Sequence, residues 1–172
     1  MNFEVLYNNF NEIENDPYPK IENIKQDYRF GKMLYDSYAG SYGELTATTQ
    51  YVYENITNEE NKELRNVLMR VAMDEMHHLK ILGELLVELG FIPYYMGSRN
   101  NKWCSDRVKY KFSCMEEMMK YNIQTEKMAI KEYERLIENT EDKCIKDILS
   151  RIIKDEENHI RIFKAIGGIQ EN

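Results

Sequence analysis

Two short segments of this sequence each place a glutamate and a histidine three positions apart. Glu75 precedes His78 in "DEMHH", and Glu156 precedes His159 in "DEENH". Residues three apart lie on the same face of a helix, so the carboxylate and the imidazole of each pair can bind one common ligand. Both pairs interrupt a helical seam of apolar residues, where an unpaired charge would be costly. Their position indicates that something other than hydrocarbon lies in the middle of the core.

The two segments belong to a longer internal repeat. The stretch "LMRVAMDEMHHLKIL" from Leu68 can be laid over "LSRIIKDEENHIRIF" from Leu149 without gaps, and Leu, Arg, Asp, Glu and His coincide. A fainter match relates "ELTATTQY" from Glu44 to "EKMAIKEY" from Glu126. The sequence therefore predicts a duplicated helical hairpin. Counted from the turns, its four glutamates lie at a similar depth in the core.

Four buried carboxylates would repel one another and take up protons unless cations neutralised them. Two divalent metal ions would do so, and oxygen and nitrogen ligands without sulfur suit iron or manganese. Asp74 and Asp155 are expected to accept the second ring N–H of the histidine from the opposite hairpin. Tyr51 and Tyr133 lie one level away from the glutamates and are either core residues or proton relays. The predicted catalytic and metal-binding residues are Glu44, Glu75, His78, Glu126, Glu156 and His159, and the small residues beside them are Gly40, Ala47, Asn122 and Ala129.

Four helices are predicted to carry these residues, over about 32–56, 58–90, 113–139 and 140–167. Short links make the first pair and the last pair antiparallel hairpins, whereas residues 91–112 are long enough to return along the bundle. Residues 1–31 contain "NDPYPKIEN" and are predicted to be an irregular lead-in. The sequence thus predicts an all-α four-helix bundle over residues 32–172, with antiparallel pairs joined by one long crossover.

Composition restricts the range of partners and compartments. The chain has 172 residues and a net charge of −7, which argues against nucleic acid or an anionic membrane as partner. Neither a transmembrane run nor a signal peptide is evident, so a cytoplasmic location is expected. The three cysteines form no C-x-x-C motif and are interpreted as reduced thiols.

The set Glu44, Glu75-x-x-His78, Glu126 and Glu156-x-x-His159 resembles the ferritin-like di-iron carboxylate proteins, and within them the rubrerythrin-like branch, over about residues 32–166. This resemblance implies a ferritin-like bundle with two iron ions, or manganese instead, that reacts with hydrogen peroxide or dioxygen in oxidative-stress defence. Rubrerythrins also carry a rubredoxin domain with paired C-x-x-C motifs, which is absent here, so a separate protein would donate electrons. They also place a second glutamate where this chain has Ala129, so the ligand set is the six-residue kind shared with bacterioferritins.

Four functional interpretations remain open at this level. The leading hypothesis is an oxidoreductase that reduces peroxide or oxygen with electrons from an external donor. The alternatives are a ferroxidase that feeds iron storage, a dimanganese catalase, and a bundle that binds metal only for stability. A homodimer through another helix face is compatible with each of them.

Overall fold

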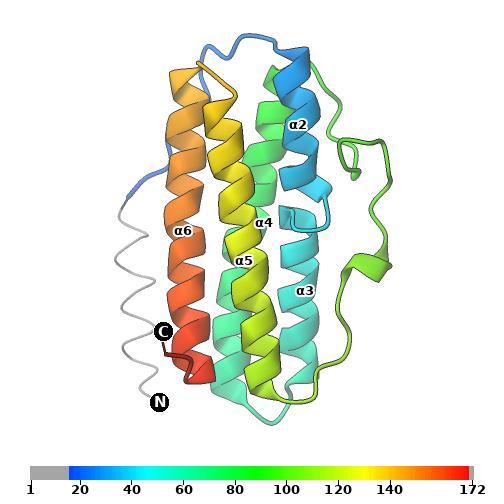
Figure 1. Cartoon of the computed structure of the whole chain (residues 1–172), viewed down its shortest axis with the longest axis vertical. Helices are drawn as coiled ribbons and strands as arrows, with labels where there is room; N and C mark the ends of the chain where they lie inside the picture. The colour runs from blue at the N-terminus through cyan, green and yellow to red at the C-terminus, as the bar shows by residue number, and fades with distance from the viewer. Residues whose placement is uncertain (1–15, 171–172) are drawn as a thin grey trace.

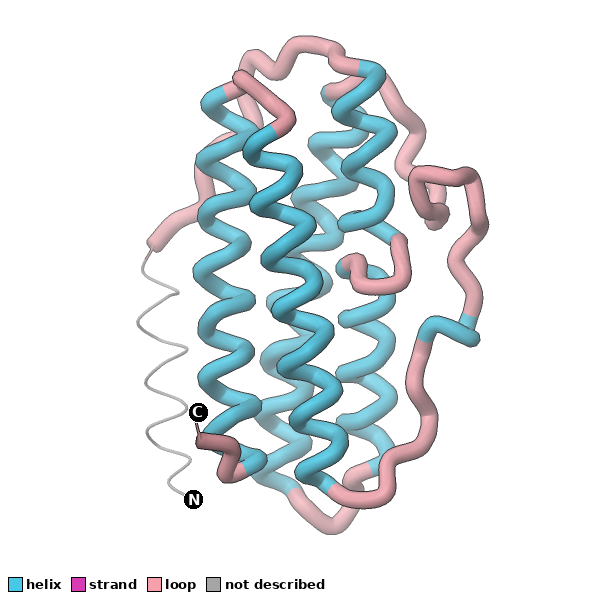
Figure 2. The backbone as a smooth tube through the Cα atoms, viewed as in Figure 1, coloured by secondary structure: helices cyan, strands magenta, loops and turns pink. Residues whose placement is uncertain are grey.

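The computed structural model describes residues 16–170, which form helices joined by loops (Figure 2). The helices are α2 (Tyr28–Ala39), α3 (Glu44–Thr57), α4 (Lys62–Glu88), the 3-10 turn η1 (Ser105–Arg107), α5 (Met115–Glu138) and α6 (Lys143–Gly167). Since α2 and α3 lie end to end, the long helices fill four positions of one bundle (Figure 1). The predicted all-α four-helix bundle is confirmed. The described residues include no helix that is both long and apolar enough to cross a membrane.

The direction of the chain also agrees with the prediction. α3 packs mainly on α4, and α5 packs mainly on α6, as two antiparallel hairpins. Residues 89–114, which include η1, run down the outside of the bundle, so that α4 and α5 are parallel (Figure 1). This long connection lets the two hairpins present equivalent faces to each other.

Three helices begin after a side chain that accepts a hydrogen bond from a backbone N–H of the first turn. These N-caps are Asp27 for α2, Asn61 for α4 and Asp142 for α6. The predicted starts near residues 32, 58 and 140 were therefore wrong by two to four positions. Asn58 and Thr140 are equally suitable caps by residue type, and their local sequence does not show which cap is used.

The prediction of one continuous helix over residues 32–56 was wrong, because the chain breaks between Ala39 and Glu44. Gly40 and Gly43 permit this break by their close approach to the end of α2. A Cβ atom on Gly40 would lie 2.2 Å from the Asp36 carbonyl oxygen, and one on Gly43 would lie 2.6 Å from it. Only glycine fits at either position without a shift of the backbone.

Donors from the crossover and from α3 form hydrogen bonds with the carbonyl groups that the break exposes. Arg107 donates to the Ala39 carbonyl at 2.8 Å. Thr46 donates to the Gly40 carbonyl at 2.8 Å, and the Trp103 indole N–H donates to the Thr46 hydroxyl at 3.0 Å. Arg107 and Trp103, which lie far away in the sequence, therefore stabilise the break between the two helices.

Two apolar clusters fill the bundle above and below a polar middle layer. The first includes Leu34, Leu82 and Leu149, and the second includes Leu68 and Phe163, all fully buried. These clusters hold the four helices at fixed spacing on both sides of the middle layer. The glutamates and histidines of the repeat occupy the layer between them.

Candidate metal centre

The structure brings all six predicted ligands together in the middle of the bundle. Glu44 begins α3, Glu75 and His78 lie on α4, Glu126 lies on α5, and α6 carries the remaining pair. Each of the six side chains is at most 2% exposed: Glu44, Glu75, His78, Glu126, Glu156 and His159. By contrast, His77 lies on the outer face of α4 and is exposed.

The six residues form two overlapping groups, each able to surround one ion. Glu44 and His78 belong to the first group, and Glu126 and His159 belong to the second. Glu75 and Glu156 belong to both, and within each group one ligand atom per residue lies within 4.8 Å of the others. Two carboxylates shared between two such groups match the arrangement of a dinuclear centre with carboxylate bridges.

Each of the two shared glutamates has a buried oxygen without a hydrogen bond. Glu75 Oε1 and Glu156 Oε1 make none within the described residues, and the nitrogen atoms beside them are His159 Nδ1 at 3.0 Å and His78 Nδ1 at 3.2 Å. A buried carboxylate oxygen without a donor is unfavourable unless a cation lies beside it. Together with the oxygen and nitrogen donors, these atoms show that the site fits a pair of divalent ions such as iron or manganese.

Five side chains of the cluster have a strongly shifted pKa: Glu44, Glu75, His78, Glu126 and His159. Burial, followed by repulsion from Glu75 and Glu156, raises the pKa of Glu44 and of Glu126 well above the usual range. Burial alone would lower the pKa of both histidines, but the surrounding carboxylates raise it well above 6.5. Burial would raise the pKa of Glu75, but His159 lowers it. The metal-free cluster therefore retains protons that metal ions would displace.

The two aspartates lie behind the histidines, but only Asp155 forms a hydrogen bond with its histidine, and His159 Nε2 makes none within the described residues. Asp155 Oδ2 is 3.2 Å from His78 Nε2, and Asp74 Oδ2 is 3.5 Å from His159 Nε2. Both contacts leave Nδ1 of each ring facing the glutamates, with His78 Nδ1 3.2 Å from Glu156 and His159 Nδ1 3.0 Å from Glu75. This orientation leaves Nδ1 as the atom available for metal binding.

The two predicted tyrosines differ in their contacts. The Tyr51 hydroxyl donates a hydrogen bond to Glu126 Oε1. Tyr133, the equivalent residue in the repeat, is buried, but its hydroxyl makes no hydrogen bond within the described part of the chain. Tyr51 is thus placed to orient a candidate ligand, whereas Tyr133 packs in the apolar cluster.

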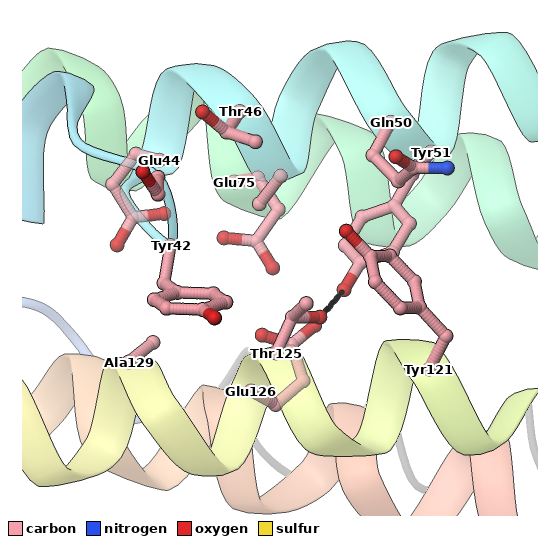
Figure 3. A pocket seen from close by; sticks show the side chains of 12 residues that line it. Tyr42, Glu44, Thr46, Gln50, Tyr51, Glu75, Tyr121, Thr125, Glu126 and Ala129 are labelled. Carbon is pink, nitrogen blue, oxygen red and sulfur yellow. Dashed lines mark hydrogen bonds between the residues drawn. The ribbon is translucent and has the colours of Figure 1, made fainter. Parts of the chain in front are cut away.

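A narrow pocket leads from the surface to the glutamates between α3 and α5. Glu44, Glu75 and Glu126 form its inner end, and Tyr42 and Ala129 lie on its walls (Figure 3). Tyr42 belongs to the break between α2 and α3, so the interrupted helix contributes directly to this opening. The small side chain of Ala129 leaves space that a glutamate at this position would fill.

Sequence reasoning missed a further buried carboxylate outside the ligand cluster, Glu54. It accepts hydrogen bonds from Gln50 at 2.8 Å and from Asn122 at 2.6 Å, and burial raises its pKa to about 7. Glu54 follows Tyr51 by three positions and Glu44 by ten, a helical spacing that could have indicated its inward direction.

Sequence reasoning also missed Tyr18, in the lead-in segment. Its hydroxyl lies 2.9 Å from His78 Nε2 and donates to Asp155. No periodicity marks an isolated residue in an irregular segment, so nothing in the local pattern points to it. Residues 1–15 of the predicted lead-in lie outside the described residues.

Comparison of the sequence with known families and proteins finds a ferritin-like family and manganese catalases. The family described as "Ferritin-like domain" matches residues 43–169. A probable manganese catalase from Clostridium acetobutylicum is 19% identical over 92% of this chain and 78% of its own length. A manganese catalase from Bacillus subtilis is also 19% identical, over 78% of this chain and 61% of its own length.

Solved structures show the same fold. A manganese catalase from Anabaena has a TM-score of 0.79 and 23% identity, over 91% of this chain and 81% of that structure. A bacterioferritin from Desulfovibrio desulfuricans, described with a diiron site, has a TM-score of 0.68 and 21% identity, over 81% of this chain and 78% of that structure. The rubrerythrin-like branch and the cytoplasmic location stay predictions.

Proposed function

We propose that this chain, which belongs to the ferritin-like domain family, holds two metal ions between its helices and decomposes hydrogen peroxide. The observation that carries the proposal is the pair of ligand groups that share Glu75 and Glu156. In this assignment Glu44 and His78 complete one position, and Glu126 and His159 complete the other.

Bound iron or manganese would supply reversible one-electron chemistry at each position and polarise the oxygen atoms of the substrate. The protein itself fixes the ligand geometry through the two aspartates and Tyr51. Its dry, buried layer limits competing reactions with water. The narrow pocket beside Ala129 suits a small neutral substrate such as peroxide.

Disproportionation is the form of this activity that the curated relatives favour, since they are named manganese catalases. One peroxide molecule is reduced to two water molecules while a second is oxidised to oxygen, so no outside electron donor is required. From the sequence alone, the leading hypothesis was reduction of peroxide or oxygen with electrons from an external donor, and dimanganese catalase was an alternative. The relatives therefore move dimanganese catalase from an alternative to the leading proposal.

A second candidate is di-iron reduction of peroxide or dioxygen with electrons from a separate protein, or oxidation of ferrous iron. The fold shared with a bacterioferritin that has a diiron site supports it. The ligand set, with carboxylates and imidazoles and no thiolate, suits iron as well as manganese.

The test is to load separate samples with Mn²⁺ and Fe²⁺ and mix each with hydrogen peroxide without a reductant. We expect two ions per chain and sustained oxygen evolution from the manganese form, measured with an oxygen electrode. Oxidation of the iron form without oxygen evolution, together with an inactive manganese form, would favour the second candidate. Two bound ions that react with neither peroxide nor oxygen would contradict both.

A further inference from the structure

The two halves of the repeat support their histidines with equivalent chains of residues. On α6, Arg151 Nη1 lies 2.6 Å from Asp155 Oδ1, and the other oxygen of Asp155 faces His78 at 3.2 Å. On α4, Arg70 Nε lies 3.9 Å from Asp74 Oδ1, and Asp74 faces His159 at 3.5 Å. The same residue types occur in the same order, yet both contacts are shorter on the His78 side.

A segment outside the repeat packs on the Arg151–Asp155 pair. Residues 16–18, named here the strap, lie against α6 before the chain crosses to α2 (Figure 1). Asp16 accepts a hydrogen bond from Arg151 Nε at 2.7 Å through its carbonyl, and its carboxylate lies 2.7 Å from Lys154 Nζ. The Tyr18 ring lies 4.3 Å from the Arg151 guanidinium. The strap therefore covers the Arg151–Asp155 pair.

Tyr18 also contacts the histidine itself. Its hydroxyl donates to Asp155 Oδ2 and lies 2.9 Å from His78 Nε2, so the Nε2 proton of His78 has two acceptors. His159 Nε2 lies 3.5 Å from Asp74, and His159 borders a pocket that Tyr18 and Asp155 also line but that His78 does not reach. The side chain of Asp74 is 29% exposed, whereas that of Asp155 is 9% exposed. Within the described residues, the contacts that support His78 are thus shorter and more numerous than those that support His159, and the aspartate behind His78 is less exposed.

We infer that the strap makes the two metal positions unequal, so that the ion at His78 is held more tightly and the ion at His159 leaves first. Tyr18 acts as a positioning residue: it fixes the ring orientation and tautomer of His78 through Nε2. Loss of such a contact behind a metal ligand typically lowers metal affinity by about 10–100-fold. The inference rests on the dinuclear centre of the proposed function but not on its reaction.

The experiment measures metal release from the full chain. Protein loaded with two Mn²⁺ ions is mixed with excess chelator, and released manganese is followed with time. We expect two phases of equal amplitude in the wild type. In Tyr18→Phe the slow phase should become at least about tenfold faster while the fast phase is unchanged.

A second variant identifies the fast phase, and a third serves as the control. Asp74→Asn changes the equivalent contact behind His159 and should accelerate the fast phase alone. Tyr28→Phe changes a tyrosine that is 77% exposed at the start of α2 and should leave both phases unchanged. Thermal unfolding of the metal-free variants shows whether each fold is intact.

The outcomes separate this inference from the proposed function. Equal acceleration of both phases by Tyr18→Phe, no acceleration, or a single phase in the wild type would overturn the role of the strap. A wild-type chain that binds fewer than two ions would overturn the dinuclear centre and the inference with it. Two-phase release from a protein that does not react with peroxide would support the strap and contradict only the proposed reaction.

Discussion

At the residue scale, the repeat made the candidate ligands visible in the sequence. Glu75 and Glu156 occupy equivalent positions, each with a histidine three residues later, and the structure brings both pairs to one buried layer. A single such pair is common on solvated helices, so the repetition carried the prediction. Tyr18 stayed hidden because its importance depends on contacts with distant segments, whereas the helical spacing of Glu54 from Glu44 could have indicated that it points inward.

Removal of a shared glutamate should affect both ions. We expect Glu75→Ala to retain fewer than two ions and Glu44→Ala to retain one, because Glu75 belongs to both ligand groups and Glu44 to one. Metal content after desalting, measured by elemental analysis, checks this, with circular dichroism as the control for helix content. Full occupancy in Glu75→Ala would contradict the assignment.

Glu54 should make stability depend on pH independently of the metal centre. Burial raises its pKa from 4.5 to about 7, so the folded chain binds this proton more tightly than the unfolded chain does. Its contribution is present below pH 4.5 and is lost as the pH rises through 7, a change of about 3 kcal/mol in unfolding free energy.

Glu54→Gln removes that titration. The buried Asn122 Oδ1 makes no hydrogen bond in the described part of the chain, so a flip of this amide can accept the new N–H group. We expect the variant to become more stable relative to wild type as the pH rises from 5 to 8, measured by urea unfolding of the metal-loaded forms. Parallel pH profiles for the two proteins would argue against this role.

At the element scale, helix order and direction followed from apolar periodicity and loop length, but the break at residues 40–43 did not. The periodic pattern continues across it, and the groups that stabilise it, Trp103 and Arg107, lie about 60 positions away. Such long-range hydrogen bonds have no signature in a local window of sequence. Close approach of the backbone at Gly40 and Gly43 became evident only from the structure.

Substitution at the break should be costly. In Gly43→Ala the new Cβ would lie 2.6 Å from two carbonyl oxygens of α2, so the backbone must shift. We expect a loss of about 1–3 kcal/mol in unfolding free energy, measured by urea denaturation. Gly83→Ala is the matched control. It lies within α4, where its Cβ would meet a side chain at 3.3 Å, and alanine favours helix. Equal effects of the two changes would show that the break tolerates a side chain.

At the scale of the whole molecule, the fold holds a polar layer between two apolar clusters, and metal binding should determine its stability. In the metal-free fold, burial and neighbouring carboxylates raise the pKa of Glu44 and Glu126, and the pKa of His78 and His159 is raised by neighbouring carboxylates against the effect of burial. For each group the stabilising contribution is present at low pH and is lost as the pH rises through the folded pKa. Glu75, with a lowered pKa, contributes the opposite trend below pH 4.5, where its stabilising contribution is lost as the pH falls.

The metal-free protein should therefore lose stability as the pH rises above 4.5, first through the glutamates and then, above 6.5, through the histidines. Metal ions replace these protons, so the loaded protein should keep its stability over the same range. Thermal unfolding of both forms at a series of pH values checks the expectation. A metal-free profile that is flat or rises between pH 5 and 9 would mean that the carboxylates are not clustered.

The central claim is that the six residues would hold two ions, with Glu75 and Glu156 shared between the two ligand groups. Anomalous X-ray diffraction from crystals of manganese-loaded protein tests it most directly, since the signal locates each metal independently of the protein atoms. We expect two peaks of similar height, one beside His78 Nδ1 and Glu44 and the other beside His159 Nδ1 and Glu126, both in contact with the shared carboxylates. A single peak, or peaks outside this layer, would contradict the account.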